Sequence, residues 1–210
     1  GYARASGGFG PVLMIGGPGI FNATGPIGAA SCDSVPLLVI TGEVATQLMG
    51  RGYFQDASCV GVDDLRTFDS MTGFSHTVPT AQALPQMLRD AFSAMLSDWR
   101  RPVHLAVPMD VQKADCPNWH PEWIPSAQVP RFADREALGR WVQEAFALGP
   151  NLGVLLGWAA IEAEATDLVQ EVAEAFALPV ASTYRAKGIL PEDHPLSLGV
   201  FGYAGNPPAD

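Results

Sequence analysis

Short apolar runs alternate with longer segments of helical periodicity along this chain of 210 residues. Runs at Pro11–Ile15, Leu37–Thr41 and Val103–Val107 are bounded by glycine or proline, as expected for strands buried on both faces of a sheet. A strand-like segment at Phe74–Val78 leads into a helical stripe. The apolar positions of that stripe are Leu84, Met87, Leu88, Ala91, Met95 and Leu96. The alternation predicts a parallel, doubly wound α/β sheet, in which ligands bind at the carboxyl ends of the strands.

A second α/β unit is predicted to begin near Phe132. Apolar residues from Leu138 to Phe146 lie on one face of its first predicted helix. A strand over Gly153–Trp158 precedes another helical stripe between Ile161 and Phe176, and Pro179–Ser182 is a further short strand.

An irregular, proline-rich stretch from Asp110 to Pro130 separates the two units. Trp119 and Trp123 need burial partners, so we expect this stretch to wrap over a surface rather than act as a flexible tether. The expected parts are a first domain over residues 1–112, a linker over 113–131, and the beginning of a second domain over 132–210.

The composition is that of a well-buried globular chain, with 48% apolar and 16% charged residues. The net charge of −10 and the lack of a basic run argue against a nucleic-acid partner. Apolar runs fall far short of the ~20 residues of a membrane span, so no membrane association is expected. Cys32, Cys59 and Cys116 are scattered and odd in number, which favours a reducing, cytoplasmic location over a disulfide framework.

The first strand run ends in a glycine-rich turn, Gly16-Gly17-Pro18-Gly19, and a helix is predicted from there to near Ser31. Glycine lets a ligand approach the backbone closely, and a helix start directs free N–H groups at an anion or a cofactor edge. The turn is not a dinucleotide fingerprint, because Asn22 occupies the third glycine position. It is not a phosphate-binding loop either, because no Lys-Ser/Thr pair follows. A tight turn without a ligand is the structural alternative.

Three further sequence blocks follow the turn. They are D-S-V-P-L-L-V-I-T-G-E-V at Asp33–Val44, G-R-G-Y-F-Q-D at Gly50–Asp56 and R-P-V-H-L-A-V-P-M-D-V at Arg101–Val111. With the G-P-G-x-x-N turn, their order and spacing resemble the pyrimidine-binding domain of thiamine-diphosphate enzymes, most closely the acetolactate-synthase-like branch. The run at Pro179–Pro195 resembles the start of that family's Rossmann-like central domain, so the resemblance covers essentially the whole chain.

The resemblance implies a cofactor site and a substrate pocket. The residues that match the family's turn beside the aminopyrimidine of thiamine diphosphate are Gly17, Pro18, Gly19 and Asn22. Phe54 and Gln55 match a Phe-Gln pair that reaches toward the active site in acetolactate synthases. An amide there can hydrogen-bond a carboxylate or carbonyl while the ring shapes the pocket. The alternative for Phe54 is an aromatic residue buried in a loop.

The implied reaction is ylid attack on a small 2-keto acid, loss of CO₂, and release or transfer of the aldehyde unit. The resemblance implies a homodimer or homotetramer with its active sites between chains. The family's catalytic Glu and its Mg²⁺-diphosphate motif, G-D-G followed by Asn, do not occur in this segment, so the chain alone is expected to be inactive. Gly1–Gly7 and Gly202–Asp210 are expected to be the cut ends of a longer chain.

Two lysines of the acetolactate-synthase pattern are missing. Met109 stands where the family has Lys in P-K-D, and the second Lys would fall near Gly73-Phe74. A flavin-contacting Arg would fall near Trp99–Arg101, where Arg100 or Arg101 could compensate only in part. The lost cations weaken the case for flavin adenine dinucleotide (FAD), which stays open as a cofactor. They favour a relative that decarboxylates or ligates a different substrate.

Other titratable residues receive structural interpretations. Glu43 matches a position that is Gln in many relatives, so it is not expected to be catalytic. Asp63 and Asp64 are expected to be solvated, and His104 is expected to be a hydrogen-bonded core residue of an apolar strand. The four histidines lack metal-ligand spacing, so no metal site is predicted in this chain.

Two other functions stay open. A non-catalytic homologue or fragment could assemble with or regulate an active enzyme, and it would bind no thiamine diphosphate. A plain dinucleotide-binding module conflicts with Asn22 in the turn.

Overall fold

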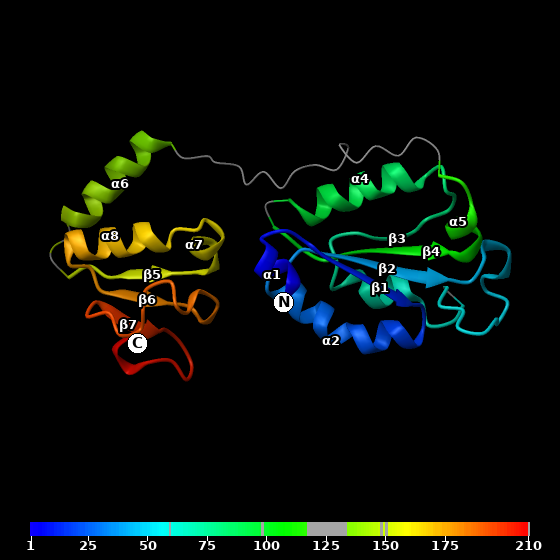
Figure 1. Cartoon of the computed structure of the whole chain (residues 1–210), viewed down its shortest axis with the longest axis horizontal. Coiled ribbons are helices and arrows are strands. Elements are labelled where there is room, and N and C mark those ends of the chain that lie inside the picture. The colour runs from blue at the N-terminus through cyan, green and yellow to red at the C-terminus, as the bar shows by residue number, and fades with distance from the viewer. Residues whose placement is uncertain (59, 98, 117–133, 148, 150, 210) are drawn as a thin grey trace. The chain divides into compact units, whose positions relative to one another are not determined.

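The computed structural model describes residues 1–58, 60–97, 99–116, 134–147, 149 and 151–209. The chain forms two compact units, Gly1–Pro130 and Arg131–Asp210 (Figure 1). Most of the predicted linker, including Trp119 and Trp123, lies outside the described residues.

The first unit contains a parallel sheet with the strand order β1-β2-β4-β3. Its strands are β1 (Gly10–Ile15), β2 (Leu37–Glu43), β3 (Ser75–Thr77) and β4 (Val103–Pro108). Strand β2 pairs in parallel with β1 and β4, and β3 pairs in parallel with β4. The predicted parallel α/β architecture is confirmed.

Helices cover both faces of this sheet, with α4 on one face and α2 on the other (Figure 1). The helices are α1 (Tyr2–Ser6), α2 (Pro18–Cys32), the 3₁₀ turn η1 (Thr46–Leu48), α3 (Asp64–Asp69), α4 (Leu84–Met95) and α5 (Met109–Lys113). Phe92 and Met95 of α4 pack on Leu105 of β4. On the opposite face, Ile20 of α2 and Phe68 of α3 belong to a second core cluster. Helical spacing in the sequence therefore located α4 correctly.

Strand β1 differs from the expectation of burial on both faces. All six residues of β4 are buried, whereas Leu13 of β1 is 79% exposed and Ile15 is also exposed. Leu13 is paired with Ile40 of β2 in the sheet, on the face where α4 packs on β2 and β4. The edge position of β1 explains the exposure, because the helix covers the neighbouring strands instead.

The second unit contains a parallel sheet in the order β5-β6-β7. Its elements are α6 (Arg135–Ala147), β5 (Val154–Leu156), α7 (Trp158–Glu162), α8 (Thr166–Phe176), β6 (Val180–Ser182), η3 (Tyr184–Ala186), β7 (Ser197–Val200) and η4 (Pro207–Ala209). The predicted helical stripe between Ile161 and Phe176 is two helices. Glu164, with φ of +52°, breaks it between α7 and α8.

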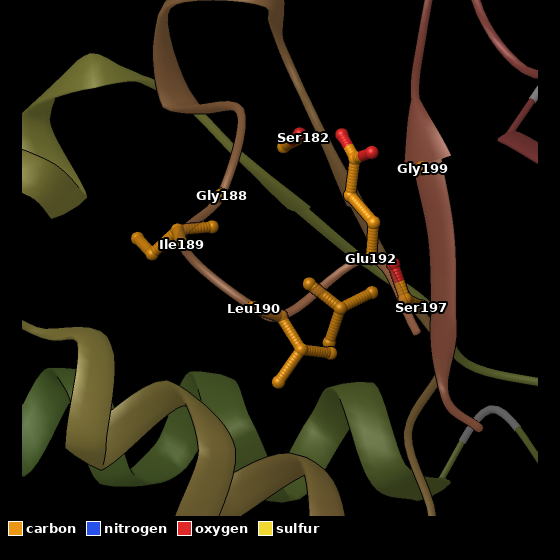
Figure 2. Close-up of a pocket in the computed structure, with 8 residues that line it drawn as sticks. Ser182, Gly188, Ile189, Leu190, Glu192, Ser197 and Gly199 are labelled. Atoms are coloured by element: carbon orange, nitrogen blue, oxygen red, sulfur yellow. The ribbon is translucent and has the colours of Figure 1, made fainter. Parts of the chain in front are cut away.

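A small pocket lies beside β6 and β7 in this second unit (Figure 2). Ser182 and Ser197 come from the strands, and Ile189, Leu190 and Glu192 come from the segment between them. Its volume of about 10 Å³ is the space of a single water molecule. This pocket does not accommodate a flavin ring.

The end of α8 offers a stability test. Ala177 caps the helix with φ of +52° and ψ of +42°, a left-handed conformation that favours glycine. We expect Ala177→Gly to raise the free energy of unfolding of this unit by about 0.5–1 kcal/mol, measured by urea unfolding. Ala175→Gly, exposed in the last turn of α8, is the matched control and should lower it by up to about 1 kcal/mol. A loss of stability in both variants would contradict the interpretation.

Candidate functional site

A glycine turn carries the chain from β1 into α2 at the carboxyl end of the sheet. The strand register pairs Ile15 with Gly42, so the turn begins beside the end of β2. The Gly16 amide donates to the Gly42 carbonyl at 3.0 Å, and a Cβ at Gly16 would lie 2.8 Å from that oxygen. Glycine is required here because a side chain would collide with the neighbouring backbone.

Helix α2 starts within the predicted cofactor motif. Gly17 caps it with φ of +62°, and Pro18 is its first residue, where the missing N–H has no helical partner to lose. Gly17 is buried and Gly19 is half-buried, while Pro18 and Asn22 are exposed. Pro26 lacks the amide that would bond the Asn22 carbonyl in a regular helix, so Asn22 offers a carbonyl as well as a side-chain amide.

The loop after β2 brings Gln55 to this turn. A Cβ at Gly17 would lie 4.0 Å from the Gln55 Cα, and one at Gly16 would lie 3.8 Å from the Gln55 carbonyl oxygen. Gln55 has φ of +60°, a strained conformation of the kind that gathers at functional sites. Phe54 is 86% exposed, so the alternative of a buried loop aromatic is wrong.

Glu43, the last residue of β2, fixes the loop that carries Gln55. Its side chain is buried, and Oε1 accepts hydrogen bonds from the Val44 amide at 2.7 Å and the Ala57 amide at 3.2 Å. Oε2 is buried and has no hydrogen-bond partner within the described part of the chain. Burial raises the pKa of this carboxyl above its ordinary value. Nothing here makes Glu43 catalytic, but sequence reasoning missed its role in holding the loop.

Two more carboxylates hold loops at this end of the sheet. Asp56 accepts hydrogen bonds from the Gly50 amide at 2.8 Å and the Ser58 amide at 3.0 Å. Asp110, in helix α5 directly after β4, accepts hydrogen bonds from the Thr46 hydroxyl at 2.6 Å and the Thr46 amide at 2.9 Å. The hydrogen bonds from Thr46 hold the pKa of Asp110 below its usual range. The Asp110–Thr46 contact joins residues far apart in the sequence, whereas Asp56 holds its own loop together.

A buried hydrogen-bond network lies on the α2–α3 face below these loops. The Thr41 hydroxyl donates to Asp64 Oδ2 at 3.0 Å and lies 2.8 Å from His104 Nε2. His104 Nδ1 lies 2.9 Å from the Ser75 hydroxyl. His104 is the hydrogen-bonded core residue that the sequence predicted. Asp64 is only 2% exposed, so its predicted solvation is wrong: α3 begins at Asp64 and turns its side chain toward Thr41.

Burial shifts both titratable members of this network. Burial raises the pKa of Asp64 to about 6. The hydrogen bond from Thr41 opposes this shift, and repulsion from Glu43 adds to it. Burial lowers the pKa of His104 to about 4. At neutral pH the network therefore holds a neutral imidazole beside an ionised carboxylate.

The compensating arginine suggested by the sequence is misplaced for this site. Arg101 lies before the first residue of β4, at its amino end, and donates to the Ser70 carbonyl at 3.1 Å. Met109, in the position of the family lysine, follows the carboxyl end of the same strand. Arg101 therefore supplies no cation to the end of the sheet where Gln55 and the glycine turn lie.

The site suits an uncharged, planar group with hydrogen-bonding edges. The glycine turn permits close backbone contact, and Gln55 and Asn22 offer amide donors and acceptors. An aminopyrimidine ring has complementary edges, whereas a diphosphate would need cations or a metal. Among the residues that the structure describes, no group of three His, Cys, Asp or Glu side chains is placed to hold a metal ion.

Two family models match this chain. The thiamine pyrophosphate enzyme N-terminal TPP-binding domain matches residues 1–63, and the thiamine pyrophosphate enzyme central domain matches residues 149–210. The chain belongs to the thiamine pyrophosphate enzymes. The first match contains the glycine turn and the Phe54-Gln55 pair, and the family predicted from the sequence is confirmed.

Acetolactate synthases are among the relatives of this chain. The probable acetolactate synthase large subunit of Methanocaldococcus jannaschii is 30% identical over 100% of this chain and 35% of its own length. Acetolactate synthase isozyme 1 large subunit of Escherichia coli is 34% identical over 98% of this chain and 35% of its own length. The chain is thus acetolactate synthase-like and spans about a third of the length of these relatives.

A solved structure shares the fold of this thiamine pyrophosphate enzyme chain. It is that of a Mycobacterium smegmatis protein described as a thiamin diphosphate-dependent enzyme, with a TM-score of 0.80 and 23% identity. The match covers 96% of this chain and 38% of that one. In the described ranges, no helix has the length and apolar character needed to cross a membrane.

Proposed function

We propose that this chain forms part of a thiamine-diphosphate-dependent 2-keto acid decarboxylase or carboligase. The observation that carries the proposal is the approach of the Gln55 backbone to the Gly16–Gly17 turn at the carboxyl end of β2, where a Cβ built at Gly17 would lie 4.0 Å from the Gln55 Cα. The acetolactate synthases among its relatives support the reaction class. The residues that would line the aminopyrimidine are Gly17, Pro18, Gly19 and Asn22. Thiamine diphosphate, when bound, supplies the carbon nucleophile and the electron sink for loss of CO₂.

The chain's own residues bind and orient the substrate. The Gln55 amide donates a hydrogen bond to the carboxylate or keto oxygen of the 2-keto acid. The exposed ring of Phe54 covers the apolar part of the substrate and excludes water from it. Glu43 acts through its hydrogen bond to Ala57 and keeps the loop against the glycine turn. Binding of Mg²⁺ and the diphosphate, and the catalytic carboxylate, are assigned to residues outside this chain.

A homodimer or homotetramer with the site between chains is part of this proposal. Leu13, Ile15 and Phe21 flank the glycine turn and expose apolar side chains, which supports a subunit contact there. Sedimentation velocity of the full-length protein measures the assembly. A fully active monomer would contradict the shared site.

The reaction is tested on the full-length protein with thiamine diphosphate and Mg²⁺, by following CO₂ release from a panel of 2-keto acids. Saturable release from at least one member is expected. Failure to bind thiamine diphosphate by calorimetry would favour the non-catalytic homologue. Binding without CO₂ release would reject only the decarboxylating reaction. The visible spectrum of the purified protein shows in the same preparation whether FAD is bound.

Phe54 provides a specific test of the substrate pocket. Because its ring is exposed, Phe54→Ala should change the free energy of unfolding by less than about 0.5 kcal/mol. We expect kcat/KM for the 2-keto acid to fall about tenfold, since a buried aromatic contact in the complex is worth about 1–2 kcal/mol. Tyr203→Ala, at another exposed aromatic residue, is the control and should leave kcat/KM unchanged. A Phe54→Ala enzyme with wild-type kcat/KM would remove Phe54 from the pocket.

A further inference from the structure

An apolar cavity of about 210 Å³ lies in the second unit between α8 and the strands β5 and β6. Because its walls offer water no hydrogen-bond partners, the cavity favours an apolar occupant. Leu168, which belongs to α8 and lines the cavity, is 60% exposed, so the cavity is open on this side. All of the lining residues are apolar: Val154, Leu156, Leu168, Val169, Val172, Ala173 and Val180.

Helix α6, which precedes β5 in the chain, carries an apolar stripe. The stripe follows the spacing i, i+3, i+4, i+7 and i+8, which is typical of a helix face that packs on a core. However, Trp141 is 68% exposed and Leu138 is 51% exposed. A tryptophan buries a large apolar area when it is covered, so this face of α6 favours packing on an apolar surface. The residues of the stripe are Leu138, Trp141, Val142, Ala145 and Phe146.

Helices α6 and α8 touch at their carboxyl-terminal ends. The rings of Phe146 and Phe176 lie 5.3 Å apart between centroids, at an interplanar angle of 47°. Figure 1 shows the two helices close together at these ends and diverging toward their amino-terminal ends. The contact joins equivalent positions, because the sequence V-x-E-A-F-A-L occurs at residues 142–148 and again at 172–178. The stripe of α6 therefore meets α8 at one end only.

This ring contact sets the register between the two helices. Residues four apart lie on the same helix face, so the next residues along the α6 face are Val142 and Leu138. The equivalent residues of α8 are Val172 and Leu168, and both also line the cavity. Because parallel strands are joined by right-handed crossovers, a helix that lies beside α8 over β5 meets these two residues. Trp141 is then on the flank of α6 that faces the sheet.

We propose that α6 closes onto α8 and β5, so that its apolar stripe covers the cavity and Trp141 fills it. Gly149, between α6 and β5, has φ of +125°, a conformation that favours glycine and can absorb the rotation of the helix. The closed arrangement leaves the ion pair of Glu136 and Arg140 in solvent on the opposite face of α6. It does not depend on the proposed reaction, because none of these residues takes part in it.

Helix α6 of the same chain is favoured over other apolar occupants of the cavity. The ring contact keeps α6 beside the cavity, at an effective concentration that a free ligand or a second copy does not reach at ordinary protein concentrations. Closure also removes the stripe from water, which lowers its tendency to associate with other chains. The closed helix is therefore a lid on the second unit rather than an exposed extension of it.

Paired cysteines test the closure in the full-length protein. Leu138→Cys combined with Leu168→Cys should form a disulfide under mild oxidation, because closure brings these two positions into contact. Arg140→Cys combined with Leu168→Cys is the matched control, since Arg140 lies within a turn of Leu138 on the outer face of α6. Each substituted side chain is more than half exposed, so the variants should fold. We expect the first bridge, identified by peptide mass spectrometry, to form at least about tenfold faster than the second. Equal rates would overturn the proposal.

Two further measurements identify the occupant of the cavity. In a mixture of ¹⁵N-labelled and unlabelled protein, the two bridged peptides should carry the same isotope, whereas bridges of mixed isotope would assign the cavity to α6 of a second copy and reject the lid. Adding Trp141→Glu to the Leu138–Leu168 cysteine pair should slow bridge formation at least about tenfold, because closure would bury a charge. Gln143→Glu adds the same charge on the outer face of α6 and should leave the rate unchanged. An unchanged rate in the Trp141→Glu variant would contradict the placement of Trp141 in the cavity.

Discussion

Gly16→Ala should lose about 1–3 kcal/mol of folding stability and, with it, most of the binding of thiamine diphosphate. The new methyl group would lie 2.8 Å from the Gly42 carbonyl oxygen and 3.2 Å from the Ala57 Cβ. The carbonyl oxygen and the Cβ are both fixed by the backbone that carries them, so neither can move aside as the end of a flexible side chain would. Overpacking of this kind lowers folding stability by about 1–3 kcal/mol. The turn must move away from β2, and the Gln55 backbone, which lies beside the turn, must move too. We expect cofactor affinity in the full-length protein to fall at least about tenfold, which corresponds to 1.4 kcal/mol.

The matched control for this prediction is Gly25→Ala in α2, the helix that follows the turn. No atom lies within 4 Å of a Cβ built at Gly25, so the substitution should be neutral or stabilise α2 by up to about 1 kcal/mol. Calorimetric titration with thiamine diphosphate and urea unfolding are measured on both variants. If Gly16→Ala binds the cofactor like Gly25→Ala, the glycine turn does not line the cofactor. If it unfolds normally but binds weakly, the proposed function gains support that is independent of any assay of CO₂ release.

The fold was largely predictable because buried parallel strands leave a strong local pattern. The apolar runs that became β2 and β4 are flanked by glycine and proline, and nearly all of their residues face packed neighbours. The run that became β1 looks the same in the sequence, but its burial depends on where α4 lies, which no local pattern records. The break between α7 and α8 was missed for a similar reason. Glu164 is an ordinary helical residue, and only its conformation in the structure ends the helix.

The residues of the candidate site also differ in how far they could be predicted from the sequence. The glycine turn and the Phe54-Gln55 pair were found because each is a short motif, and the resemblance to a family gave them a role. The loop-holding role of Glu43 was missed and the solvation of Asp64 was predicted wrongly, because both depend on contacts with residues distant in the sequence. Asp64 next to Asp63 reads as a polar loop, and nothing in that dipeptide indicates that Thr41 and His104 bury it. The spacing of residues along the sequence does not predict hydrogen bonds between side chains of separate strands and helices.

Opposing pH dependences of stability are expected from Asp64 and His104. The pKa of Asp64 is raised from 3.8 to about 6 in the folded state, so its contribution is full below pH 4 and is lost as the pH rises through 6. The pKa of His104 is lowered from 6.5 to about 4, so its contribution is full above pH 6.5 and is lost as the pH falls through 4. At 1.36 kcal/mol per pKa unit, each contribution is about 3 kcal/mol. Between pH 4 and 6 the two slopes have opposite signs and largely cancel in the wild type.

Removing either group should expose the slope of the other. In Asp64→Asn, the free energy of unfolding should fall by about 3 kcal/mol relative to Asp69→Asn as the pH is lowered from 7 to 4, because the neutral His104 remains. In His104→Gln, compared with the exposed His76→Gln, it should fall by a similar amount as the pH is raised from 4 to 7, because the buried Asp64 must ionise. Urea unfolding of the four variants across this range gives both slopes, and the controls remove the background of other carboxylates. If the free energy of unfolding changes with pH in the same direction in Asp64→Asn and His104→Gln, the opposite pKa shifts of Asp64 and His104 are contradicted. Slopes of opposite sign would show that the pH dependence of the free energy of unfolding of the first unit is set by the His104 imidazole and the Asp64 carboxyl, which are connected through Thr41.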